Sequence, residues 1–111
     1  MKTIAAIATA QGVGGIGIIR ISGDKAIKIG DKVFRAHSGS KLLECKGYQA
    51  KFGQVVDNGE VIDDAIALVF RNPHSYTGED VVEISCHGGL YITRKTLELV
   101  IKAGASFAEP G

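Results

Sequence analysis

Two charged side chains, Arg20 and Glu83, each stand between apolar β-branched residues, in the stretches Ile19–Ile21 and Val82–Ile84. Along an extended strand, alternation places each charge on the face opposite its apolar neighbours. A guanidinium is a planar fork of donors suited to ligand oxygens, and one carboxylate can accept two hydrogen bonds from the edge of a heterocycle. The structural alternatives are a solvated Glu83 carboxylate on an open sheet face, or an Arg20–Glu83 ion pair that contributes little stability if exposed.

A glycine-rich segment, Gly12–Gly17, has the composition of a nucleotide-binding loop. Phosphate-binding loops are followed by a helix whose N-terminus faces the anion. Here the segment runs into Ile18–Ser22, which is typical of a strand, and the chain has no Walker-type Gly-Lys-Ser/Thr sequence. We therefore expect a turn in which the backbone approaches a neighbouring element closely.

A third polar cluster, His87-Gly88-Gly89, precedes a predicted helix. Its backbone NH groups could bind an anion. Alternatively, the glycines are needed only because no side chain fits where the strand connects to the helix, and we favour this second interpretation. Cys86 and His87 are too few ligands for zinc. Cys45 and Cys86 have no paired spacing, so both are expected to be reduced thiols.

The turn before the Glu83 strand carries His74, Tyr76 and Thr77. These side chains either line the rim of a pocket or only shape the turn, and the sequence leaves both alternatives open.

Apolar runs predict strands over Ile4–Ala8, Ile16–Ser22, Tyr48–Val56, Glu60–Phe70, Asp80–Cys86 and Ser106–Ala108. Helical spacing predicts helices from Ala26 to about Arg35, after helix-start chemistry at Ser22–Asp24, and over Leu90–Ala103, ending before Gly104. The segment His37–Gly47 stays unassigned.

Asp57-Asn58-Gly59 between two strands is a strong hairpin signal, because a type I′ turn needs positive φ at both central residues. The strand Glu60–Phe70 is apolar on both faces, so we expect it to be central and covered on both sides. The predicted fold class is α+β, a mostly antiparallel or mixed sheet with two helices on one face.

The chain has 111 residues, 45% of them hydrophobic and 23% charged, which is ordinary for one globular domain. Thirteen basic and twelve acidic residues leave a formal charge of +1, which gives the domain no direct electrostatic footprint for a nucleic acid. No apolar run approaches the length of about 18 residues that a membrane span needs, and no signal-peptide pattern is present. We therefore expect a cytoplasmic protein without membrane contact.

The long polar stretch Asn72–Gly89, together with Thr3–Thr9 and Gly12–Gly23, resembles the amino-terminal domain of the MnmE (TrmE) family of tRNA modification GTPases. The resemblance runs from Thr3 to Gly111, with a variable middle over Ile27–Tyr48. It implies that residues 1–111 form a single domain that binds formyl-tetrahydrofolate and makes a homodimer. Its fold is expected to be similar to half of the folate-binding unit of aminomethyltransferases.

By this resemblance, the cofactor-binding residues are Arg20 and Glu83. A pterin presents a ring NH beside an exocyclic amine, and one carboxylate can accept from both. Analogues without those donors are rejected, because the buried carboxylate would be left unpaired. We identify no catalytic residue and no metal ligand, so the fragment is expected to be a binding module and not a catalyst.

The resemblance also implies the role of the intact protein. With the flavoprotein MnmG, it would install a carboxymethylaminomethyl-type group on the wobble uridine of certain tRNAs, using a folate one-carbon unit. GTP, magnesium and potassium belong to a GTPase domain, and another folate-contacting lysine lies downstream; both are absent here. Two alternatives stay open: a purely structural dimerisation domain without ligand, and a small folate-dependent one-carbon transferase.

Overall fold

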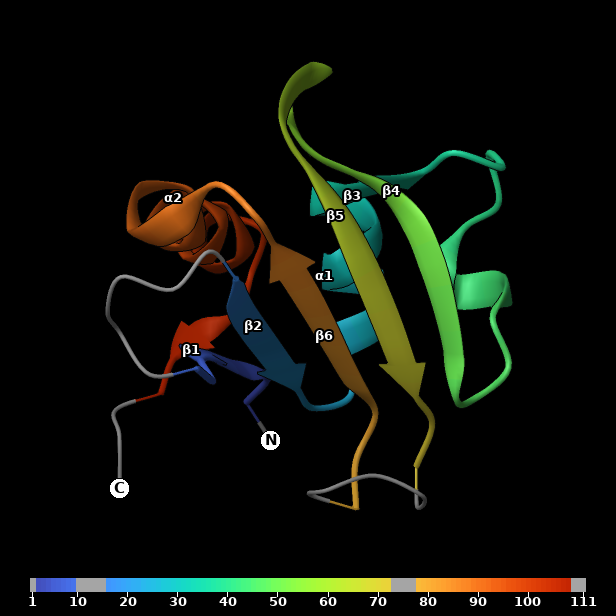
Figure 1. Cartoon of the computed structure of the whole chain (residues 1–111). Helices are drawn as coiled ribbons and strands as arrows, with labels where there is room; N and C mark the ends of the chain where they lie inside the picture. The colour runs from blue at the N-terminus through green and yellow to red at the C-terminus, as the bar shows by residue number, and fades with distance from the viewer. Residues whose placement is uncertain (1, 10–15, 73–77, 109–111) are drawn as a thin grey trace.

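The computed structural model describes residues 2–9, 16–72 and 78–108, which form one mixed sheet and two helices (Figure 1). The strands are β1 (Ile4–Ile7), β2 (Gly17–Ser22), β3 (Phe34–Ala36), β4 (Gln49–Asp57), β5 (Glu60–Phe70), β6 (Val81–Cys86) and β7 (Ser106–Phe107). The helices are α1 (Ala26–Val33) and α2 (Gly89–Lys102), and a 3₁₀ turn, η1, spans Leu42–Glu44. The predicted α+β class is confirmed.

The sheet has the strand order β3-β4-β5-β6-β2-β1-β7. The described pairs are antiparallel, except that β1 and β7 run parallel. The β4–β5 hairpin turns at Asn58 and Gly59, whose φ angles are 50° and 86°. Two successive positive φ values are what a type I′ turn requires, so the predicted hairpin is confirmed.

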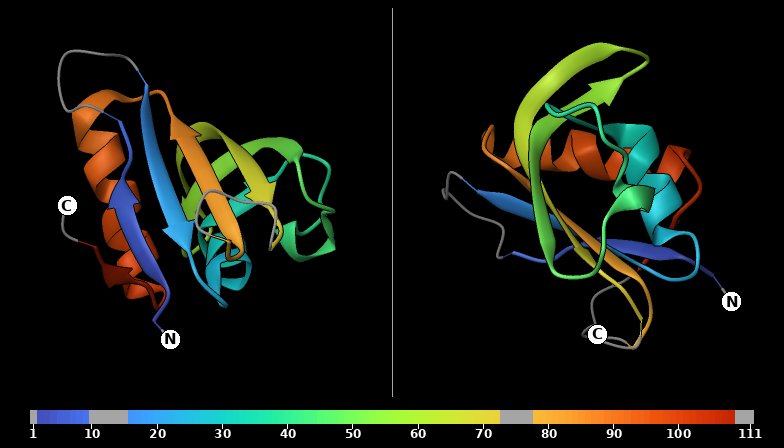
Figure 2. Two further views of the ribbon diagram at one scale, coloured as in Figure 1. Left: turned by 90° about the horizontal axis from the view of Figure 1, so that it is seen from below. Right: turned by 90° about the vertical axis from the view of Figure 1, so that its right-hand side faces the viewer.

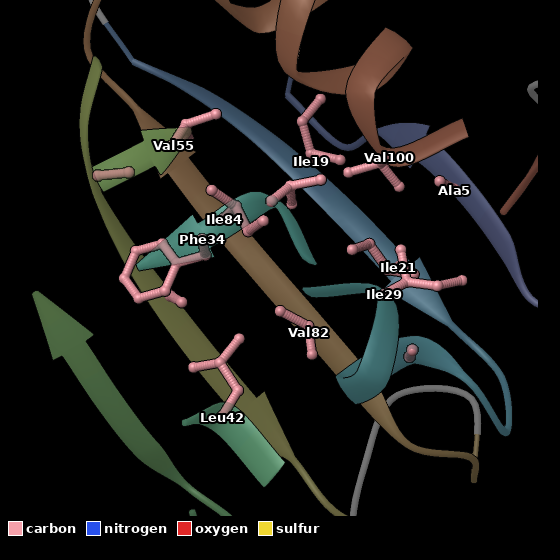
Figure 3. Close-up of a cluster of buried hydrophobic side chains, with 14 of the residues drawn as sticks. Ala5, Ile19, Ile21, Ile29, Phe34, Leu42, Val55, Val82, Ile84 and Val100 are labelled. Carbon is pink, nitrogen blue, oxygen red and sulfur yellow. The ribbon is translucent and has the colours of Figure 1, made fainter. Parts of the chain in front are cut away.

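Both helices cover the same face of the sheet, and the main core lies beneath them (Figures 2 and 3). Ile19 and Ile21 of β2 and Val82 and Ile84 of β6 are 0% exposed. The helices add apolar side chains to the same cluster, among them Ile29 from α1 and Val100 from α2 (Figure 3). Removal of this apolar surface from water is the main stabilising contribution to the fold.

The first helix differs from the prediction at both ends. It stops at Val33 and not at Arg35, because Phe34–Ala36 forms an edge strand against β4. At its start, the Lys25 NH donates to Thr3 Oγ1 at 3.0 Å. This contact comes from the residue just before β1, and no side-chain cap from Ser22–Asp24 forms at the start of α1.

Strand β5 is central, but the expectation that both its faces are covered is wrong for this chain. One face is buried under α1 and its neighbours, whereas the alternate residues are only half-buried; these are Ile66, Leu68 and Phe70. The sheet therefore has a helix-covered face and an open face.

Among the described residues, neither helix has the length and apolar character needed to cross a membrane.

Candidate functional site

Arg20 and Glu83 face each other across two neighbouring strands. They are direct register partners in the antiparallel pair β2–β6. Arg20 Nε donates to Glu83 Oε2 at 2.7 Å, and Arg20 Nη2 lies 2.7 Å from the same oxygen. Their apolar neighbours point into the core, so the predicted placement of both charges on the opposite face is confirmed.

The two partners differ in exposure. Glu83 is 7% exposed, while the Arg20 side chain is 39% exposed. Both arginine contacts fall on Oε2 of Glu83, and within the described chain no hydrogen bond reaches Oε1. The ion pair is therefore formed without a ligand, and Oε1 of Glu83 can still accept a hydrogen bond.

Apolar side chains surround this ion pair on the open face. In the register of the sheet, Glu83 lies opposite Leu68 on β5 and Arg20 lies opposite Ala6 on β1. The half-buried apolar residues on this face of the central strands are Ile18, Ile66, Leu68 and Phe70. A flat heterocycle can rest on such a floor while its polar edge meets the carboxylate, as in most small-molecule sites.

A second polar contact lies two residues further along β2, on the same face of the strand as Arg20. Ser22 Oγ donates to Glu79 Oε2 at 3.1 Å. The sequence suggested helix-start chemistry for Ser22 but did not predict its contact with Glu79. The signal was present, because alternation places Ser22 on the same face as Arg20.

Two of the NH groups in His87-Gly88-Gly89 are occupied from within the protein. Those of His87 and Gly88 donate to Asp63 Oδ2 on β5, at 2.9 and 3.0 Å. Gly89 has a φ of 80°, a conformation that favours glycine. These observations support the strand-to-helix interpretation, since an internal carboxylate already binds the two NH groups just before α2.

The Cys86 side chain is buried on the helix-covered face, with Sγ 3.4 Å from Thr96 Oγ1. Burial raises the pKa of the Cys86 thiol; the Thr96 hydrogen bond lowers it, and the negative charge of Asp63 raises it further. Cys45 is also buried, and both cysteines are free thiols. Within the described part of the chain, no group of three His, Cys, Asp or Glu residues is placed to hold a metal ion.

The glycine-rich segment approaches α2 closely at its last residue. A Cβ atom at Gly17 would lie 2.0 Å from Thr93 Oγ1. Close backbone approach, as the sequence predicted, is therefore confirmed at this position. The predictions for Gly12–Gly15 and for His74, Tyr76 and Thr77 lie outside the described residues.

Comparison with known proteins identifies the same family across almost the whole chain. A family model described as "GTP-binding protein TrmE N-terminus" matches residues 3–111. Three curated relatives carry the name tRNA modification GTPase MnmE. They are 52% identical over 111 residues in Symbiobacterium thermophilum, 50% over 113 in Parabacteroides distasonis and 48% over 109 in Clostridioides difficile. The matches cover 98–100% of this chain but 24% of each relative, so the chain spans about a quarter of their length.

Proposed function

The chain belongs to the TrmE N-terminal family, and on that basis we propose that it is the folate-binding and homodimerisation domain of a tRNA modification GTPase. Its ligand in this proposal is formyl-tetrahydrofolate, held by Arg20 and Glu83. Within residues 1–111 we assign binding and no catalysis.

The observation that carries the folate proposal is the Arg20–Glu83 pair on the open face. Glu83 is nearly buried and keeps Oε1 as an acceptor, which suits the paired donors on the edge of a pterin. A hydrogen bond from such a donor to a carboxylate is stronger than one between neutral groups. Arg20 is already oriented by its contact with Glu83, and its planar guanidinium is suited to a ligand oxygen.

For the intact protein, the proposal places the one-carbon unit of the folate in tRNA modification. The product would be a carboxymethylaminomethyl-type wobble uridine, made in the cytoplasm together with the flavoprotein MnmG. GTP, magnesium and potassium would act in a GTPase domain that does not belong to residues 1–111.

Isothermal titration calorimetry with 5-formyl-tetrahydrofolate tests the ligand directly. We expect saturable heat with one site per chain, and no such heat with a folate whose pterin lacks the exocyclic amine. Absence of saturable heat with the natural pterin would overturn folate binding by this chain and favour a purely structural domain.

The homodimer proposal rests on the open face. Several apolar side chains are exposed there at the periphery of the sheet, including Phe52 at 68% and Ile4 at 40%. An apolar surface of this kind usually marks an interface, and most soluble oligomers are closed homodimers. A lasting dimer would bury more than about 1,000 Å² in total.

Analytical ultracentrifugation over a hundredfold range of concentration tests the dimer. We expect a species of twice the 11.7 kDa chain mass, and dissociation of it by Phe52→Lys. The matched control is Tyr91→Lys on α2, which replaces another exposed aromatic residue, 75% exposed, on a different surface. A single 11.7 kDa species at all concentrations, with and without folate, contradicts the proposal.

A further inference from the structure

The positive charge of this nearly neutral chain is concentrated in one segment. Residues 25–51 contain seven of the thirteen Lys and Arg residues but only two of the twelve acidic residues. That segment has a formal charge of +5, whereas the whole chain has +1. The total charge therefore conceals a basic region, which consists of α1, β3, η1 and the start of β4.

Both acidic residues of this segment bind backbone NH groups. Asp31 Oδ1 accepts from the Leu42 NH at 2.6 Å, and Asp31 Oδ2 accepts from the Leu43 NH at 3.0 Å. Glu44 Oε1 accepts from the Lys41 NH at 2.9 Å. In the described part of the chain, neither carboxylate forms an ion pair with a lysine or arginine. The acids fix the 3₁₀ turn, and within the described residues no cation of the segment forms an ion pair with an acid.

Three of these cations surround a depression of about 420 Å³. Lys32 comes from the last turn of α1, Arg35 from the edge strand β3, and Lys41 from the start of η1. Ser40, the hairpin residue Asn58 and Asp31 complete its polar wall, and the Asp31 carboxylate is engaged by the Leu42 and Leu43 NH groups. Figure 2 (right) shows α1 and η1 side by side at this edge of the molecule. We call this depression the basic pocket.

We propose that the basic pocket binds phosphate groups of an RNA backbone; this inference rests on the proposed role in tRNA modification. Lysine, arginine, serine and asparagine side chains make most protein contacts to phosphodiesters. A protein partner would instead be expected at a surface with exposed aromatic and apolar anchors, and the wall of this pocket is mainly charged and polar. The planar Arg35 guanidinium can bind a phosphate through two parallel hydrogen bonds.

This site is separate from the proposed folate site. Arg20 and Glu83 lie on the open face of β2 and β6, whereas the basic pocket lies at the β3 edge, beside α1. The proposed contacts are to phosphate groups, so binding is expected to depend on salt and little on sequence.

Fluorescence anisotropy of an end-labelled, unmodified tRNA transcript, titrated with this 111-residue chain at low salt, tests the proposal. We expect Arg35→Gln/Lys41→Gln to weaken binding about tenfold and to reduce the slope of log affinity against log salt by about 2. The matched control is Arg94→Gln/Lys102→Gln on α2, which removes the same charge from two exposed residues and leaves the pocket intact. We expect nearly unchanged binding for the control.

Three outcomes would overturn the inference. Equal losses for the two double variants would mean that diffuse charge, and not the pocket, attracts RNA. Unchanged binding in the Arg35→Gln/Lys41→Gln chain would exclude the pocket. A poly-glutamate peptide that binds through Arg35 and Lys41 more tightly than the RNA would assign the pocket to an acidic protein segment. If the double variant does not fold, the exposed Lys41→Gln substitution alone is expected to show about half of the change in salt slope.

The RNA and folate proposals fail independently. Arg35→Gln/Lys41→Gln is expected to keep the calorimetric folate signal, and Glu83→Gln is expected to keep RNA binding. A chain without folate affinity but with pocket-dependent RNA binding would therefore disprove the folate proposal alone.

Discussion

The two faces of strands β2 and β6 are built from alternating residues of the same short segments, yet they are organised differently. On the helix-covered face, Ile19, Ile21, Val82 and Ile84 are fully buried. On the open face, the intervening residues form an ion pair on an apolar floor. Each strand therefore contributes a packed core with one set of side chains and a candidate binding site with the other.

This difference suggests how stability and binding are divided. A tightly packed core face holds the strand backbone still, which fixes the positions of groups on the opposite face. The open-face ion pair contributes little net stability, because Arg20 is substantially exposed to solvent. Substitutions on the two faces should therefore have separable effects.

The largest expected effect is a loss of stability on the helix-covered face. Ile84→Ala removes a fully buried side chain and should lower the free energy of unfolding by about 3–4 kcal/mol, since it leaves a cavity in the core. Leu68→Ala, which truncates a half-buried residue on the open face, should cost about 1 kcal/mol. Urea unfolding at low protein concentration measures both. Equal losses would contradict the distinction between the faces.

A smaller effect, on binding alone, is expected on the open face. Glu83→Gln should weaken folate binding by about 1.5–3 kcal/mol, because the amide presents a donor to the pterin donors or loses charge assistance. The free energy of unfolding should change by less than about 1 kcal/mol. The control is Asp64→Asn, which neutralises an exposed carboxylate on β5. A folded Glu83→Gln chain that binds folate with unchanged affinity would disprove the assignment.

Sequence alone was sufficient where one local rule decides the structure. Asn58-Gly59 determines the hairpin, because few other residue pairs adopt two positive φ values. Alternation determines the faces of Arg20 and Glu83, because successive strand residues point to opposite sides. The fold class followed from the order of such elements, and the family from the long polar stretch.

The structural features that the sequence did not predict depend on pairing between distant segments of the chain. The contact between Arg20 and Glu83 depends on β2 lying beside β6 in one particular register, which no local pattern specifies. The contact of Thr3 with the start of α1 has the same origin. Phe34 and Arg35 continue the helical spacing of α1, but pairing with β4 overrides it. In each of these cases a tertiary contact, and not the local preference of the sequence, determined the structure.

Two adjacent aspartates on β5 sharpen the comparison between the faces. Asp63 accepts from the NH groups of His87 and Gly88 just before α2, whereas Asp64 is exposed and points to the other side. Asp63→Ala should lower the free energy of unfolding by about 1 kcal/mol, because it removes the acceptor of two backbone NH groups. Asp64→Ala should cost less than about 0.5 kcal/mol. Equal costs in urea unfolding would show that the hydrogen bonds to Asp63 contribute nothing specific.

The smallest expected effect concerns Cys86, the titratable group buried on the helix-covered face of the strand that carries Glu83. Burial raises the pKa of its thiol, so at alkaline pH the folded chain retains a proton that the unfolded chain loses. Stability from this group is complete below the thiol pKa of the unfolded chain, about 8.5, and decreases as the pH rises toward the raised pKa of the folded chain.

Between pH 8 and 9, this titration should lower the free energy of unfolding by up to about 0.7 kcal/mol. Cys86→Ala removes the titrating group, so its unfolding free energy should decrease less over the same interval, whatever its absolute stability. Urea unfolding of both chains in reducing buffer at the two pH values measures how much the unfolding free energy of each chain changes. The contributions of the other titrating groups are common to both chains and cancel in the comparison. Parallel pH dependences would show that the Cys86 thiol ionises as readily in the folded chain as in the unfolded one. The helix-covered face would then be open enough to hydrate a charge, and its contrast with the open face would be weaker than the packing indicates.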